Sequence, residues 1–213
     1  MSTTPPTGTP SGKPRYHHGD LRQALIDASR QLLVEKGAEN FSLADACRVA
    51  GVSTAAPYKH FRDKLEILKA IVEQGFESMA ERSMTAVHAK GEGTIDGVIA
   101  MGQAYIAFAL EETAVFRLMF GHNNAIKRDE DVERTGRACF SNVIRQVAIF
   151  CERNEVEGDP LRIALGLWTF VHGAACLLID EDYEKVAPGV DIDAMIAETA
   201  VKLLPMSPAG AAR

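Results

Sequence analysis

The side chains with the most specific chemistry in this sequence lie within a short segment, Ser53 to Phe61, and just after it. The leading side chains are small enough to let a helix approach base edges in a DNA groove, and they are Ser53, Thr54, Ala55 and Ala56. Polar or cationic side chains that can bind phosphate oxygens follow: Tyr58, Lys59, His60 and Lys64. The pattern therefore favours an element that enters the major groove of DNA.

Pro57 complicates this interpretation. Counted from Ser53 as the N-cap, Pro57 is the fourth helical residue, and its missing N–H costs one bond of the first turn. One alternative is that Pro57 ends or kinks the segment; we expect the helix Thr54 to Phe61 to tolerate it. Tyr58 and Phe61 have core packing as their alternative, and we expect Phe61 in the core and Tyr58, with its polar tip, at phosphate.

Three helix starts are predicted before residue 67 from capping-box spacing, and the pairs are Asp20 with Gln23, Ser42 with Asp45, and Asp63 with Glu66. The first helix should end at Gly37, and the second should span Ser42 to Ala50. Gly51-Val52-Ser53 supplies the turn to the third. A helix, a glycine-containing turn and a helix cannot bury their apolar faces alone, so a three-helix unit is expected, with an ordinary helical hairpin as the alternative.

Charge is unevenly distributed over the 213 residues. The chain carries a net charge of −6, but residues 13 to 64 hold nine Lys and Arg against six acids. A mildly basic N-terminal part on an acidic remainder indicates that only the N-terminal part meets a polyanion.

The rest of the chain predicts an all-α fold, because apolar residues recur at helical spacing and alternating runs are nearly absent. Helices are expected at Lys64 to about His88, Ile95 to Glu112, Val115 to Phe120, Asp131 to Asn154, Leu161 to Ile179 and Ile192 to Leu204. Asp159-Pro160 is a good N-cap and first residue for the fifth of these. No linker interrupts the helix from Lys64, so the connection between the two parts should be rigid.

Aromatic and methionine side chains make the second part a candidate for an adaptable small-molecule pocket, although each of them could simply be core. The candidates are Met101, Tyr105, Phe108, Phe116, Met119, Phe120, Phe140, Trp168 and His172. A hydrogen-bonded core histidine is the alternative for His172. No metal pair, P-loop, dinucleotide fingerprint or nucleophile elbow occurs, so we predict no catalytic residue, no metal and no cofactor.

The segment Ile163 to Ile179 is apolar but, at about 25 Å, shorter than a ~30 Å membrane core, so we expect a buried core helix. Gly166 and Gly173 lie seven residues apart on one stripe, which lets another helix approach closely. With Ile192 and Ile196 of the last helix they are the predicted dimer interface. Four cysteines without C-x-x-C spacing and the absence of a secretory signal favour free thiols in the cytoplasm.

Several of these motifs together resemble TetR-family transcriptional regulators. The resemblance is carried by Tyr16–Leu21, Phe41–Leu43, Ala50–Ser53 and Ala56–Lys64, and it is dense over residues 16 to 68. Trp168-Thr-Phe-Val-His-Gly173 resembles the subgroup with the Trp-His-Gly ligand-binding domain. The resemblance implies a homodimer on a pseudo-palindromic operator of double-stranded DNA, a repressor released by a small-molecule effector, and no membrane.

Residue by residue, the resemblance implies that Thr54, Ala55 and Ala56 read bases, and that Ser42, Tyr58, Lys59, His60 and Lys64 bind phosphate. Many members have Arg where this chain has Ala44, and the basic entry Arg15, His17 and His18 could compensate at the backbone or minor groove.

The domain division expected from all of this is a disordered tail over 1–14, a helix-turn-helix domain over 15–64, an effector-binding and dimerisation domain over 65–204, and a flexible tail over 205–213. The alternatives to a regulator are an all-α small-molecule-binding protein or enzyme, and a protein-interaction module that has lost DNA binding.

Overall fold

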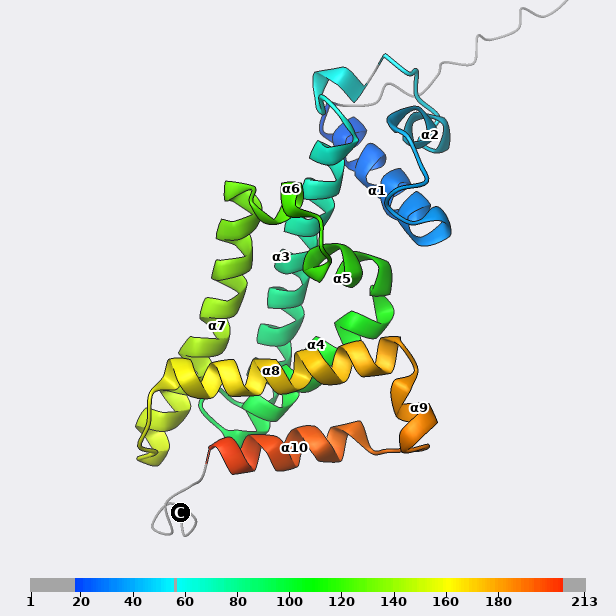
Figure 1. Cartoon of the computed structure of the whole chain (residues 1–213). Coiled ribbons are helices and arrows are strands. Elements are labelled where there is room, and N and C mark those ends of the chain that lie inside the picture. Colours follow the sequence, from blue (N-terminus) through cyan, green and yellow to red (C-terminus); the bar gives the residue numbers. More distant parts are fainter. Residues whose placement is uncertain (1–17, 56, 205–213) are drawn as a thin grey trace, which may run out of the picture.

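The computed structural model describes residues 18–55 and 57–204, and every regular element within them is helical, as predicted (Figure 1). The elements are α1 (His18–Lys36), α2 (Leu43–Val49), η1 (Pro57–Lys59), α3 (Lys64–Lys90), α4 (Ile95–Glu111), α5 (Thr113–Phe120), α6 (Asn124–Lys127), α7 (Glu130–Asn154), α8 (Pro160–Ile179), α9 (Asp182–Val186) and α10 (Ile192–Leu203). The predicted tails, together with Arg15, His17 and Ala56, lie outside the described residues.

The first two helices pack as a small unit on the start of α3. Leu25, Ala28 and Leu32 of α1 are buried. Gly37, with φ 77°, follows the last residue of α1, and Gly51, with φ 69°, follows α2. Both glycines adopt the left-handed conformation that other residues avoid, so the two turns are set by the sequence.

Two local predictions about this unit are wrong. The first helix begins at His18, so Asp20 lies inside its first turn and is not its N-cap. The third helix is only the 3₁₀ turn Pro57–Lys59, because proline lacks the N–H of an α-helical bond and disfavours helical geometry in the residue before it.

Helix α3 joins the N-terminal unit to the rest without interruption (Figure 1). Asp63 caps its first turn by accepting a bond from the Glu66 N–H at 3.0 Å. The Glu66 carboxylate accepts from the N–H of Arg62, one residue before the N-cap, rather than from the N–H of Asp63 as in a complete capping box. One hydrophobic cluster continues from Leu25 and Phe61 along α3 to Phe116 and Val171, so the two parts share a core.

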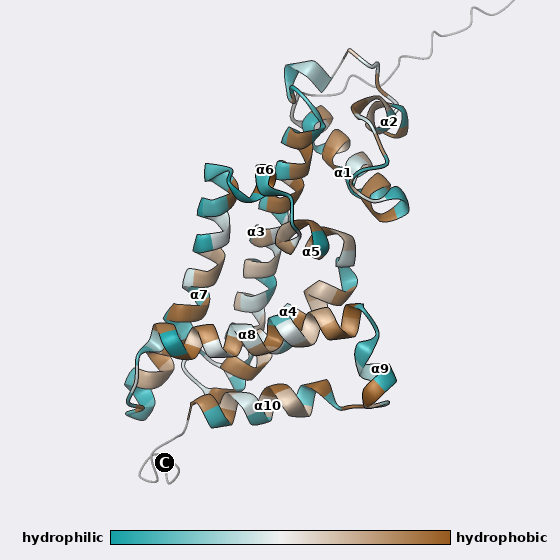
Figure 2. Ribbon diagram, viewed as in Figure 1, coloured by the Kyte–Doolittle hydropathy of each residue, from teal (hydrophilic) through white to brown (hydrophobic). Residues whose placement is uncertain are grey.

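Helices α8 and α10 pack side by side at the end of the molecule opposite α1 and α2 (Figure 1). Asp159 and Pro160 start α8 as predicted, with Asp159 accepting from the Leu161 N–H at 3.0 Å. The prediction that α8 is a buried core helix is wrong. By length and composition alone α8 could cross a membrane, and only 22% of its apolar window is buried within this chain. Hydrophobic residues recur along both helices (Figure 2).

Candidate functional site

The N-cap of α2 forms the complete capping box that the sequence predicted. Ser42 Oγ accepts from the Asp45 N–H at 3.2 Å, and Asp45 Oδ2 accepts from the Ser42 N–H at 2.9 Å. The Ser42 hydroxyl also donates to Asp45 at 2.6 Å. These bonds, with the Arg48 guanidinium at 2.7 Å, hold the pKa of Asp45 well below its usual range. Ser42 is exposed, but its hydroxyl is already engaged in positioning α2.

The segment after the Gly51 turn presents its predicted base-reading residues to solvent. Ser53, Thr54 and Ala55 are exposed. Pro57 and Phe61 anchor the segment, since both are buried, and this confirms Phe61 as a core residue. The carbonyl oxygen of Pro57 accepts hydrogen bonds from the N–H groups of His60 and Phe61, each at 2.8 Å. The exposed residues are therefore anchored on their C-terminal side.

Aromatic and cationic side chains follow the exposed residues Ser53 to Ala55. Tyr58 is 66% exposed, which excludes the core-packing alternative within this chain, and Lys59 is exposed beside it. His60 is half-buried. The backbone of His18 starts α1, and the structure does not describe its side chain.

Lys64 lies differently from the other predicted phosphate contacts. Its ammonium group donates to the carbonyl oxygens of Ala38 at 2.9 Å and Phe41 at 3.0 Å, and it lies 5.1 Å from the centre of the Phe41 ring. Lys64 therefore ties the loop between α1 and α2 to the start of α3. Two of its three N–H bonds are directed into the protein.

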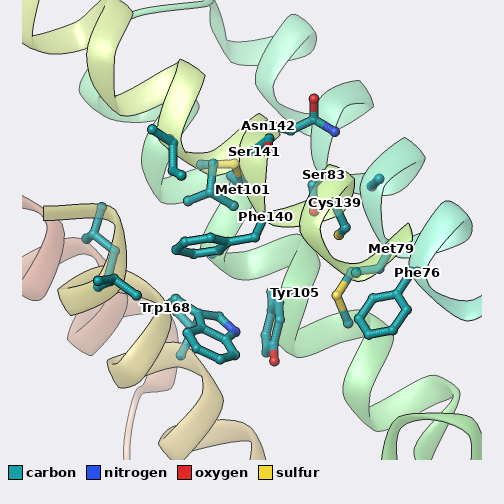
Figure 3. Close-up of a pocket in the computed structure, with 18 of the residues that line it drawn as sticks. Phe76, Met79, Ser83, Met101, Tyr105, Cys139, Phe140, Ser141, Asn142 and Trp168 are labelled. Atoms are coloured by element: carbon teal, nitrogen blue, oxygen red, sulfur yellow. The ribbon is translucent and has the colours of Figure 1, made fainter. Parts of the chain in front are cut away.

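A cavity of about 580 Å³ lies among α3, α4, α5, α6, α7, α8 and α10 (Figure 3). This volume is within the range of small-molecule sites, and the wall is almost entirely apolar. Six of the nine pocket candidates line it: Met101, Tyr105, Met119, Phe120, Phe140 and Trp168. Figure 3 shows Tyr105, Phe140 and Trp168 converging on one region of the cavity.

Three candidates do not line the cavity. Phe108 is 1% exposed and packs under the Arg82 guanidinium, and Phe116 is 2% exposed behind Phe120. His172 also lies behind the wall, because its Nδ1 is 2.8 Å from the hydroxyl oxygen of Tyr105. All three are core residues, and sequence spacing alone does not distinguish a core residue from a residue of a cavity wall.

His172 is held in an aromatic cluster. Its ring lies 4.8 Å from that of Phe120 and 5.6 Å from that of Trp168. Burial, and to a smaller extent the positive charge of Lys127, lower the pKa of His172, so the imidazole is neutral at pH 7. The alternative of a hydrogen-bonded core histidine describes this side chain.

Sequence reasoning missed the contributions of α3, α6 and much of α7 to the wall. Phe76, Met79 and Ser83 face the cavity from α3, and their i, i+3, i+7 spacing was an available signal. Lys127 comes from α6, a one-turn helix with no periodicity to reveal it. Cys139 also lines the cavity, and burial raises the pKa of its thiol to about 11. All four cysteines are free thiols.

The predicted dimer residues have separate locations. Ile196 is 3% exposed, lines the cavity and packs on Gly102, so its assignment to an interface is a misplacement of a core residue. Gly166 faces α10 of its own chain, where a Cβ would lie 3.3 Å from Leu203. Ile192 is half-buried against the core. Gly173 faces open space.

In the part of the chain that the structure describes, a helix and a glycine turn present an exposed segment, and one long helix joins this unit to an apolar cavity. This arrangement is that of DNA-binding transcriptional regulators. Residues 25–71 match the family model described as bacterial regulatory proteins, tetR family, and residues 98–203 match the tetracyclin repressor-like C-terminal domain. The chain belongs to the TetR family of transcriptional regulators.

Known proteins resemble the chain to different extents. The HTH-type transcriptional regulator SrpR of Pseudomonas putida is 30% identical over 86 residues, which are 32% of this chain and 40% of that protein. This chain therefore matches less than two thirds of SrpR. BetI of Rhizobium meliloti is 25% identical over 184 residues, 84% of this chain and 85% of that regulator. A solved structure of a protein of unknown function from Rhodococcus sp. RHA1 superimposes with a TM-score of 0.78 at 30% identity, covering 90% and 97% of the two chains.

Proposed function

We propose that this chain is a cytoplasmic, ligand-responsive repressor that binds a pseudo-palindromic operator as a homodimer and is released when a small molecule occupies the cavity. The observation that carries the proposal is the uninterrupted α3, which begins beside the exposed segment and lines the cavity with Phe76 and Met79. The helix-turn-helix domain is taken as residues 15–64 and the effector domain as 65–204. The Trp168 to Gly173 motif supports the Trp-His-Gly subgroup.

In this proposal the exposed segment enters the major groove. Thr54 and its alanine neighbours read base edges and thymine methyls, and Tyr58, Lys59 and His60 bind phosphates. Each base contact contributes on the order of 1 to 3 kcal/mol to discrimination. No arginine stands at Ala44, so apolar contacts and DNA shape carry a large share of the specificity.

A stripe on α8 supports the homodimer. Residues spaced four apart face solvent along it, and they are Leu161, Leu165, Thr169, Gly173 and Leu177. The three leucines are 41 to 44% exposed, and Val201 of α10 is 55% exposed. Rows of this spacing pack on an equivalent helix at about −50°, and the glycine permits close approach. We therefore assign the covering partner to a second copy of this chain, with Gly173 retained from the predicted interface.

Helix α5 connects the cavity to the DNA-binding unit. Met119 and Phe120 line the cavity, while Glu112, which precedes α5, pairs with Arg30 of α1 at 3.4 Å. A Cβ at Gly75 of α3 would lie 2.7 Å from the sulfur of Met119, so α3 and α5 are in close contact. A ligand that favours a displaced α5 therefore shifts the population of DNA-binding orientations.

The test is operator binding. The dimer should bind a DNA fragment from upstream of its own gene, or a DNA sequence recovered by selection. Ala55→Glu should abolish this binding without lowering the melting temperature. Lys90→Gln, a change on an exposed lysine far from the segment, is the control. Specific binding that survives Ala55→Glu would reject the segment, and failure to bind any selected sequence would favour a module that has lost DNA binding.

A further inference from the structure

The cavity wall distinguishes among classes of effector by its charge. Side chains that are charged at pH 7 are few on the wall, and they come from α6 and α7: Lys127, Glu133 and Arg137. Glu133 accepts from Arg137 at 2.9 Å, so these two compensate each other. Among the ion pairs of the described residues, none includes Lys127. Lys127, which is exposed, is therefore the one charged side chain of the described wall without an ion-pair partner.

The remaining polar groups of the wall are neutral at pH 7. Desolvation raises the pKa of the Tyr105 hydroxyl and of the Cys139 thiol, so neither ionises. His172 behind the wall is also neutral, because burial and, to a smaller extent, the positive charge of Lys127 lower its pKa. A neutral apolar wall with one cation at its edge is complementary to an amphipathic anion.

A cationic ligand suits the wall less well. Aromatic faces attract cations, but the rings here pack against one another. The rings of Phe120 and Trp168 are 6.4 Å apart, and those of Phe140 and Trp168 are 5.5 Å apart, both in tilted arrangements. Lys127 would also repel a second cation.

The single lysine also favours a carboxylate over a phosphate. Phosphate groups are typically held by the fork of an arginine or by several backbone N–H groups, whereas a lysine is a compact point charge. The one arginine on the wall, Arg137, is engaged with Glu133.

We propose that the effector is a monocarboxylate with an apolar body, whose carboxylate pairs with Lys127 and whose body lies against Phe120, Phe140 and Trp168. This inference rests on the proposed effector function and adds the chemical class of the ligand. The pairing selects anions, and burial of the apolar body supplies most of the affinity.

Trp168 is the only tryptophan in the chain and lines the cavity, so its fluorescence reports occupancy directly. The experiment titrates the full-length protein with three probes that share a ten-carbon chain, below their micellar concentrations: decanoate, 1-decanol and decyltrimethylammonium. Decanoate should bind at least tenfold more tightly than 1-decanol, and decyltrimethylammonium should bind most weakly.

Lys127→Gln should reduce decanoate affinity about tenfold, corresponding to about 1.4 kcal/mol, and leave 1-decanol affinity unchanged. Lys90→Gln is the matched control and should change neither. Equal decanoate binding by Lys127→Gln and wild type, tighter binding of the cationic probe, or no Trp168 response to any probe would each overturn the proposal. Circular dichroism establishes that the variants are folded.

A second readout separates this inference from the proposed function. Release of a bound operator fragment is followed by fluorescence anisotropy with the same three probes. Binding of decanoate without release would leave the ligand class standing and reject effector control of DNA binding. Release by the cationic probe alone would support the regulator and reject the anionic class.

Discussion

Lys64 offers a test that separates a structural role from DNA contact. Its ammonium donates to the carbonyls of Ala38 and Phe41 and lies on the Phe41 ring. Lys64→Met keeps most of the apolar stem and removes both bonds. Hydrogen bonds from a charged donor contribute about 1.5 to 3 kcal/mol each, but this side chain is only half-buried, so water replaces part of the loss. We expect a loss of about 2 kcal/mol in the free energy of unfolding.

For a chain of this length, a loss of that size lowers the melting temperature by roughly 4 to 8 °C. The assay pairs thermal unfolding with the salt dependence of operator binding, measured for wild type, Lys64→Met and Lys59→Met. Each phosphate contact contributes about −0.9 to the slope of log K against log salt, so losing one contact in each subunit flattens the slope by nearly 2. Lys59→Met should flatten the slope and leave the melting temperature unchanged. Lys64→Met should lower the melting temperature and leave the slope unchanged.

An unchanged melting temperature, together with a slope flattened as much as in Lys59→Met, would refute a structural role for Lys64. That result would return Lys64 to the phosphate contacts that the family resemblance implies.

Three further outcomes are expected. Leu165→Glu places a charge in the exposed stripe of α8 and should convert the dimer to a monomer in sedimentation velocity, whereas Arg162→Glu, a neighbouring exposed position outside the four-residue spacing, should not. Glu112→Gln breaks the ion pair with Arg30, a half-exposed contact of about 0.5 to 1 kcal/mol, and should reduce effector-induced loss of operator affinity by two- to fivefold while ligand binding by Trp168 fluorescence is unchanged. The pKa of His172 is lowered in the folded chain, so as the pH falls the unfolded chain takes up a proton on this residue first. The free energy of unfolding should therefore fall as the pH drops below about 6.5. In denaturant titrations, His172→Gln should lose less stability than wild type between pH 7 and pH 5.

Much of the fold could be predicted because its signals are local. Caps at Ser42, Asp63 and Asp159 and the glycine turns fix helix ends through bonds to nearby residues, and the structure contains each of them. The short α6 and α9 were missed because one turn carries no periodicity. The 3₁₀ turn at Pro57 also follows from a local signal, because the missing proline N–H costs the predicted helix Thr54 to Phe61 more than we expected.

The candidate sites depend on contacts between distant residues, which one sequence reveals only in part. An apolar stripe predicts that Ile196 and Phe116 are covered, but not whether a cavity, the core or a second chain covers them. Lys64 is similar: its cationic type suggested phosphate, while its partners lie 23 and 26 residues away in sequence. The exposure of α8 could be found only once the other helices had been placed.

The shared core along α3 also has a mechanical consequence. The stretch of this helix from Ser83 at the cavity to Lys64 is about 28 Å long at 1.5 Å per residue. A tilt of roughly 5° about the cavity end would move the other end by about 2.5 Å, on the geometry of a straight rod of that length. Two copies tilting in opposite senses would alter the span between their DNA-facing segments by up to twice that amount, with no flexible joint to absorb the change.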